Sequence, residues 1–165
     1  MRFFLLCLLF LSVFSSCVDR EKNDYRSIEN LELKLREQQE LTQDSIFADE
    51  LLQAYRIFLS SHPQSPKKPE ILFKYGEVLN GQSKWMNAVE IFHQVHDNHP
   101  NSPLAPLALF QQAYCFEKLE QRLTAKNTYQ DFIMRYPKHP YIEQAKGMIA
   151  LLQYSDEELM QQFQE

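Results

Sequence analysis

The sequence predicts an all-α protein, a short right-handed solenoid of about three helix–turn–helix units. Three observations support this prediction. Residue classes recur with a period of 37, and apolar residues within each period recur at helical spacing. The chain of 165 residues also contains only three glycines, which disfavours a turn-rich β-sandwich. With 44% hydrophobic and 24% charged residues, the composition is that of a globular domain.

The first residues are typical of a secretory signal. Arg2 supplies a positive charge, residues 3–14 are apolar except for Ser12, and two small residues follow before Cys17. This apolar run is too short for a transmembrane helix, which needs about 20 residues. We therefore expect residues 1–16 to be a signal peptide.

Cys17 follows the small pair Ser15-Ser16 and resembles the acylated cysteine of a bacterial lipobox. Phe14 stands where Leu or Val is commoner, so cleavage by signal peptidase I near Ser16 is the alternative. Loss of residues 1–16 leaves only Cys17 and Cys115, too few for a disulfide framework. Two or more acyl chains anchor a protein stably. We expect lipidation at Cys17, with residues 17–24 as a solvated, lipidated tether.

The repeat is clearest in the prolines. The same shift of 37 superposes two sets of prolines and several sets of apolar or small residues. These sets are Pro63, Pro100 and Pro137; Pro66, Pro103 and Pro140; Tyr55, Phe92 and Tyr129; Phe58, Val95 and Phe132; Gly76, Ala113 and Ala150; Ala88 and Ala125; and Phe73 and Phe110.

Turn residues predict where the helices of each unit end. Gly81 can take the left-handed conformation that ends the first helix, and the second helix ends before His99-Pro100. Ser102 can cap the next helix, with Pro103 in its first turn. Ser65-Pro66 repeats this pattern, and His139-Pro140 repeats it without the serine. We expect the small residues Gly76, Ala113 and Ala150 to lie where the paired helices come close.

The two ends extend the repeat domain, which we place at residues 25–154. Residues 25–43 lack Gly and Pro and contain strong helix formers. They are the degenerate first helix of the first unit or, alternatively, a coiled-coil stalk. At the other end, Ser155 and Glu158 form a capping box. We expect residues 155–165 to form a C-terminal helix that caps the last repeat or docks on a partner.

The order of small, aromatic, apolar and proline residues resembles the tetratricopeptide repeat. It is read as Gly76, Leu79, Ala88, Phe92, Val95, Pro100 and again as Ala113, Phe116, Ala125, Tyr129, Phe132, Pro137. The usual unit is about 34 residues long. The longer period of this chain places the extra residues in the proline corner. This longer corner resembles the repeats of bacterial envelope lipoproteins, such as the lipoprotein of the outer-membrane assembly machinery and the Tol–Pal partner.

No arrangement of residues predicts catalysis. His93, His96 and His99 drift around a helix, and no ligand set completes a metal site. His96 aligns with Leu59 and Ile133, so we expect it to be partly packed. Cys115 lacks an adjacent base, which favours a buried small hydrophobe. We expect no enzyme activity, no metal and no cofactor, and a formal charge of −5 argues against nucleic acid as a partner.

The remaining chemistry is surface recognition. The resemblance implies that the first helices line a concave, partner-binding side. Aromatic residues beside carboxylates suit a protein segment with apolar anchors and positive charge. For the two phenylalanines the alternative is packing between repeats. The candidate groove residues are Phe73, Glu77, Asn80, Phe110, Tyr114, Glu117, Gln144 and Leu151.

The expected function is that of a lipid-anchored scaffold that binds envelope proteins. Outer-membrane assembly or maintenance is what the resemblance implies. Two alternatives are a self-associating structural lipoprotein and an accessory subunit that binds a ligand or glycan. We expect an outer-membrane lipoprotein of a Gram-negative cell envelope that faces the periplasm. Asp19 and Glu21 also resemble surface-export signals, so the cell surface is the alternative.

Overall fold

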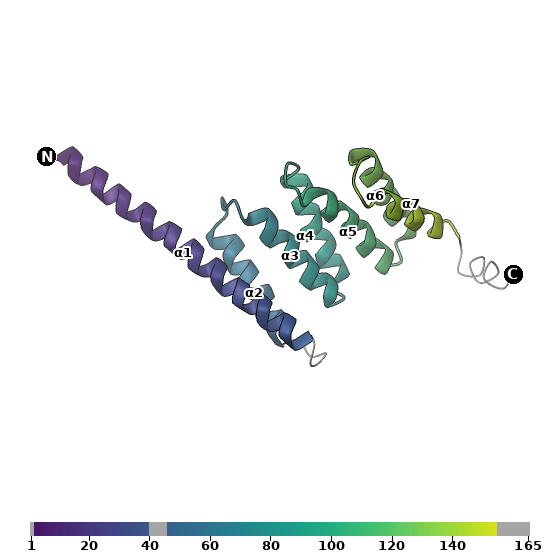
Figure 1. Ribbon diagram of the computed structural model, residues 1–165, viewed down its shortest axis with the longest axis horizontal. Helices are drawn as coiled ribbons and strands as arrows, with labels where there is room; N and C mark the ends of the chain where they lie inside the picture. Colours follow the sequence, from purple (N-terminus) through teal and green to yellow (C-terminus); the bar gives the residue numbers. More distant parts are fainter. Residues whose placement is uncertain (1, 40–45, 155–165) are drawn as a thin grey trace. The chain divides into compact units, whose positions relative to one another are not determined.

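The computed structural model describes residues 2–39 and 46–154, and every regular element in them is an α-helix (Figure 1). This confirms the predicted all-α repeat fold. The helices are α1 (Arg2–Gln39), α2 (Ile46–Ser61), α3 (Lys68–Gly81), α4 (Trp85–Asn98), α5 (Ala105–Lys118), α6 (Arg122–Arg135) and α7 (Ile142–Leu151).

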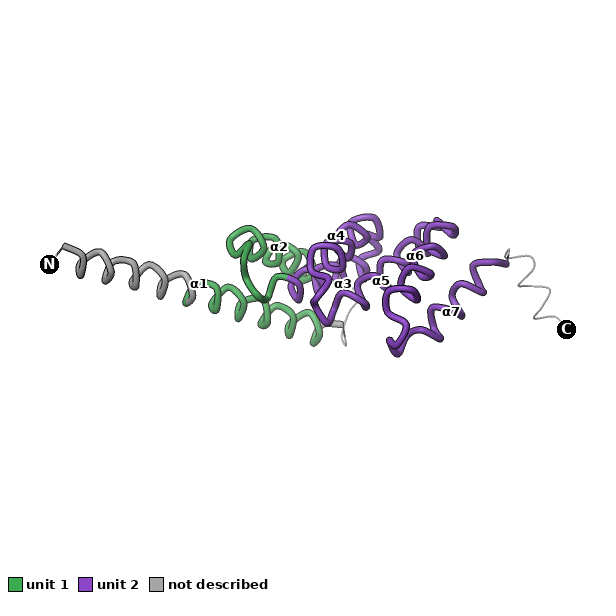
Figure 2. The backbone as a smooth tube through the Cα atoms, turned by 90° about the horizontal axis from the view of Figure 1, so that it is seen from above, with its two compact units in different colours: residues 1–68 green, residues 69–165 purple. Residues whose placement is uncertain are grey.

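The chain divides into two compact units, residues 1–68 and residues 69–165 (Figure 2). In the first unit α1 lies against α2. In the second unit α4 packs on α5, α5 on α6, and α6 on α7. Among the described residues, no helix is both long and apolar enough to cross a membrane.

The helix boundaries follow the period predicted from the sequence. The helices α3, α5 and α7 begin at Lys68, Ala105 and Ile142, so the same interval separates each start from the next. The helices α4 and α6 begin at Trp85 and Arg122 and are equal in length. A periodic sequence pattern therefore becomes a periodic arrangement of helices.

Each proline corner is closed by the same hydrogen bonds. A side-chain acceptor accepts a hydrogen bond from the N–H two residues later: Ser65 Oγ at 3.0 Å, Ser102 Oγ at 3.2 Å and His139 Nδ1 at 3.2 Å. The imidazole of His139 thus replaces the serine hydroxyl in the third corner. The serine is not the helix cap that the sequence predicts, because α5 begins three residues after Ser102 and its N-cap residue is Leu104.

The helix ends at the inner turns also differ from the prediction. Gly81 was expected in the left-handed conformation, but no described glycine has a positive φ. Ser83 (φ 58°) and Glu120 (φ 59°), which are one period apart, occupy that conformation. The Lys84 N–H bonds the Leu79 carbonyl, as in a Schellman motif. The chain therefore continues two residues beyond the glycine before it reverses.

Small residues do allow close packing between paired helices. A Cβ on Gly76 would lie 2.6 Å from Cε1 of Phe92, so the glycine makes room for that ring. Ala113 is fully buried in the core cluster that contains Tyr129. The expectation fails at Ala150, which is exposed, because no described helix follows α7 to cover it.

The N-terminal helix differs from the predicted tether. The sequence predicts a solvated tether over residues 17–24, but the helical backbone of α1 runs through that segment without a break. Ile28 is buried, the rings of Tyr25 and Phe58 are 6.2 Å apart, and Tyr55 donates a hydrogen bond to Glu32 at 2.9 Å. These contacts make α1 the first helix of the first unit rather than a stalk. The predicted capping helix at residues 155–165 lies outside the described residues.

Candidate protein-binding surface

Two of the predicted groove residues belong to the core. Phe73 is 5% exposed, and its ring centroid lies 5.6 Å from that of Phe92. Phe110 is 6% exposed and lies 5.3 Å from the ring of Tyr129 and 5.5 Å from that of Phe132. The packing interpretation is therefore correct for both, because the space above the small residues needs large rings to fill it.

Four other predicted residues define what we call the α3–α5 surface: Glu77, Asn80, Tyr114 and Glu117. Glu77 and Tyr114 are equivalent positions one period apart, as are Asn80 and Glu117. The four are exposed or half-buried. The Cys115 thiol donates to Asn80 Oδ1 at 3.6 Å, which shows that this edge of α3 lies beside α5.

Neighbouring contacts orient the α5 side of this surface. The ammonium of Lys118 lies 5.1 Å from the centroid of the Tyr114 ring, within range of a cation–π interaction. Glu117 accepts a hydrogen bond from the hydroxyl of buried Tyr129 at 3.5 Å. One carboxylate oxygen thus faces the core, so Glu117 both supports the packing and presents charge.

The electrostatics of this region keep two buried side chains protonated. Burial raises the pKa of the Cys115 thiol to about 12, so the thiolate that a nucleophile needs is not formed near neutral pH. Burial and the adjacent Glu117 carboxylate also raise the pKa of Tyr129. Both groups therefore stay neutral and act as hydrogen-bond donors.

The last two predicted residues lie on α7. Gln144 is exposed and Leu151 is 49% exposed. Leu151 has the same repeat position as Glu77 and Tyr114. The second unit therefore presents the corresponding positions of α3, α5 and α7 outside the core.

A buried polar chain between α4 and α5 was only partly expected. His96 Nε2 lies 3.0 Å from Gln112 Oε1, and Gln112 donates in turn to the Val89 carbonyl at 3.3 Å. His96 is packed, as its alignment with apolar residues suggested, but nothing singled out Gln112. Burial lowers the pKa of His96. Among the described residues, no three His, Cys, Asp or Glu side chains gather as metal ligands would.

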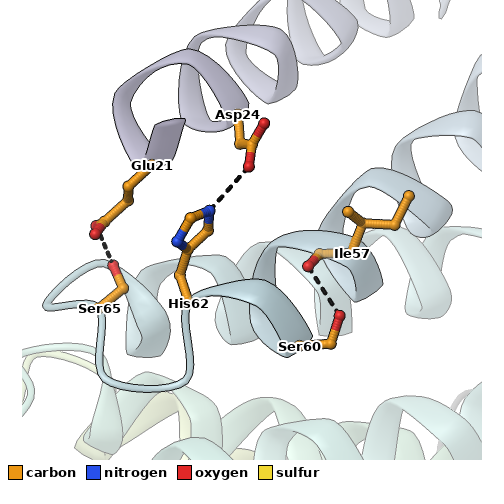
Figure 3. Close-up of polar contacts among 6 residues, drawn as sticks. All are labelled: Glu21, Asp24, Ile57, Ser60, His62 and Ser65. Atoms are coloured by element: carbon orange, nitrogen blue, oxygen red, sulfur yellow. Dashed lines mark hydrogen bonds and ion pairs between the residues drawn. The ribbon is translucent and has the colours of Figure 1, made fainter. Parts of the chain in front are cut away.

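Sequence reasoning also missed a polar cluster near Cys17. Ser65 donates a hydrogen bond to Glu21 Oε1 at 2.6 Å, and His62 Nε2 lies 2.9 Å from Asp24 Oδ2 (Figure 3). The Lys67 ammonium lies 4.7 Å from the centroid of the Tyr25 ring. The sequence signal was available, since Glu21 and Asp24 are three apart and share a helix face. The corner that they contact was not predictable from spacing.

Comparison with known proteins agrees with the repeat geometry. A family model described as the tetratricopeptide repeat matches residues 70–102 and 107–139. The two segments contain α3–α4 and α5–α6, apart from the first residues of α3 and α5, and end in the proline corners. No curated protein matches the chain. Over these two segments the chain is thus similar to tetratricopeptide-repeat proteins, whose paired helices typically serve as scaffolds for protein–protein interaction.

Proposed function

We propose that this protein is a lipid-anchored scaffold that binds another protein of the bacterial cell envelope through its α3–α5 surface. The single observation that supports this best is the position of Tyr114. It is half-exposed on α5, while the core positions of the same helix are filled by Phe110 and Ala113. An aromatic side chain that keeps part of its surface exposed is available for recognition.

The chemistry of the surface suggests the class of partner. Tyr114 offers an aromatic face, and Glu77 and Glu117 bring negative charge to two neighbouring first helices. This combination fits a protein segment with an apolar anchor and a nearby Lys or Arg. A role in outer-membrane assembly or maintenance is consistent with such a scaffold.

Anchoring through Cys17 completes the proposal. Cys17 lies four residues, about one helical turn, before Glu21, whose carboxylate contacts the corner after α2. Acyl chains on Cys17 would therefore hold the first unit close to the membrane. The outer membrane, with the protein on its periplasmic face, is the location that we propose.

Affinity purification from detergent extracts tests the partner surface. Tyr114→Ala is expected to lose a partner that the unchanged protein retains. Glu117→Gln is the better test of charge than Glu117→Lys, because the amide keeps an acceptor for the Tyr129 hydroxyl. Gln130→Ala, at an exposed position of α6, is the control. Equal recovery of partners by Tyr114→Ala and the control would contradict the proposed surface.

Metabolic labelling with a fatty acid tests the anchor separately. Label is expected in the unchanged protein and in Cys7→Ser, and it should be lost in Cys17→Ser. Mass spectrometry should find an acylated Cys17 as the first residue. A mature protein that starts near residue 17 without acyl groups would indicate cleavage by signal peptidase I and refute the anchor.

A further inference from the structure

The α7 helix has a face that remains open where the equivalent face of α5 is covered. Gly147 and Ala150 occupy the positions that Phe110 and Ala113 occupy one period earlier. Phe110 and Ala113 are buried in the cluster that contains Tyr129 of α6, but Gly147 and Ala150 are exposed. On the same side of α7, Leu151 is 49% exposed and Tyr154, just beyond the helix, 39%.

Gly147 marks this face most clearly. A Cβ built on Gly147 meets no described atom within 4 Å, whereas one built on Gly76 lies 2.6 Å from Phe92. A glycine inside a helix costs about 1 kcal/mol relative to alanine. In α3 that cost is offset by close packing of the Phe92 ring. Among the described residues, nothing offsets it in α7.

The spacing of residues along the chain identifies a segment that could cover the open face of α7. The interval from Gly76 to Phe92 equals the interval from Ala113 to Tyr129, and Phe163 follows Gly147 at that same interval. The α7 helix ends at Leu151, four residues before the position equivalent to the ends of α3 and α5. Because α7 ends about one helical turn earlier than α3 and α5 do, the small residue that makes room for the facing ring should also lie about one turn earlier. That residue is Gly147 rather than Ala150.

We propose that residues 155–165 of this chain form the second helix of the third unit and cover α7, with Phe163 over Gly147. Four residues, 152–155, would join the two, one more than join α3 to α4 and α5 to α6. Ser155 and Glu158 supply a capping box at the start. The step from Asp156 to Phe163 equals the step from Trp85 to Phe92 and from Arg122 to Tyr129.

The apolar residues of this segment match the open face. Leu159 and Phe163 are four apart and share a helix face, with Met160 beside them. In an antiparallel hairpin that places Phe163 at Gly147, Leu159 falls opposite Leu151. The start of the segment is also positioned, because Arg122 of α6 donates a hydrogen bond to the Tyr154 carbonyl.

This cap changes the assignment of the binding surface. Leu151 becomes part of a helix pair, so it leaves the set of predicted partner-binding residues. The α3–α5 surface is unaffected. The cap does not depend on the function proposed above, and its failure would leave that function untouched.

The direction in which one substitution changes the thermal stability tests the cap. Gly147→Leu in the full chain is expected to lower the midpoint of thermal unfolding by about 4–8 °C, because a leucine would displace the Phe163 ring. In a Phe163→Ala background the same substitution should lower it little or raise it. Gly81→Leu is the matched control, since a Cβ there also meets no described atom within 4 Å. It should raise the midpoint in both backgrounds, because leucine is the better helix former.

Two results would overturn the proposal. One is a rise in the midpoint for Gly147→Leu equal to that of Gly81→Leu, which would mean that nothing covers α7. The other comes from sedimentation of the unchanged protein. A dimer that dissociates in Phe163→Ala would show that a second copy, rather than the same chain, covers this face. The cap requires that the mass of the protein in solution is the same with and without Phe163→Ala.

Discussion

His62 Nε2, just after α2, lies 2.9 Å from Oδ2 of Asp24, which is on α1. A carboxylate only accepts hydrogen bonds, so Nε2 is the protonated ring nitrogen in this pair. Together with the bond from Ser65 to Glu21, the pair fastens one turn of α1 to the corner that follows α2. Residues four and seven positions after the proposed anchor are thereby part of the folded unit.

Asp24→Ala is expected to loosen the start of α1. The loss should be about 1 kcal/mol, because His62 is mostly buried but Asp24 is partly exposed to screening by solvent. Hydrogen exchange of the amides of residues 21–28 should become faster. Asp24→Asn keeps an acceptor and should lose less, and Glu29→Ala, exposed on the same helix, should change nothing. Unchanged exchange in Asp24→Ala would show that the pair does not hold the helix.

Ser83→Gly and Glu120→Gly are expected to stabilise the protein. Both residues adopt a left-handed backbone conformation in which glycine avoids the steric cost of a Cβ. Each substitution should add about 0.5–1 kcal/mol to the free energy of unfolding, measured by chemical denaturation. Ser83→Ala keeps the Cβ and is the control that should bring no such gain. If alanine stabilised as much as glycine, the backbone conformation would not be the cause.

Ala113→Leu is expected to overpack the contact between α5 and α6. Ala113 is fully buried among Phe110, Tyr129 and Phe132, so the larger side chain should cost about 1–3 kcal/mol. Gly76→Ala should also destabilise, since its Cβ would meet the Phe92 ring, and Phe92→Leu should relieve part of that loss. Thermal unfolding measures both effects. A double variant no better than the sum of its single variants would contradict direct contact.

Acid is expected to weaken the fold through His96. Burial is the main cause of its lowered pKa; the Gln112 hydrogen bond and Asp97 act against it, and His93 and Arg135 add to it. Above the unfolded pKa of about 6.5 His96 is neutral in both states and contributes nothing. As the pH falls below that value, only the unfolded chain takes up the proton, so stability declines.

The pH dependence of unfolding measures this contribution. His96→Leu should reduce the fall in the free energy of unfolding between about pH 7 and pH 5. Leucine is the residue at the equivalent position, Leu59. The control is Gln94→Leu, at an exposed position on the same helix. An unchanged pH profile in His96→Leu would assign the acid sensitivity to another group.

Much of the fold was predictable because the same types of residue recur at equal intervals along the sequence. Prolines at equal spacing end one helix, and the next helix begins only after the corner. Small residues opposite aromatic rings allow the paired helices to pack closely. These are local or pairwise constraints, so a period of 37 read from Pro63, Pro100 and Pro137 is enough to place helix pairs.

Errors arose where the choice between neighbouring residues depends on packing. In the turn after α3, Ser83 rather than Gly81 has the left-handed backbone conformation. The position of the turn is set by where the chain must reverse direction to pack α4 against α3, and not by where a glycine is available. Phe73 and Phe110 could have faced a partner or the core, and only their neighbours decide that question.

The sequence by itself determined the helical repeat, its period and the residues that can pack or turn. The tertiary structure decided which of those residues are covered, that α1 is folded onto α2, and that Asp24 meets His62. The physical reason is that propensity and spacing act over a few neighbouring residues, whereas burial depends on which distant segments share a space.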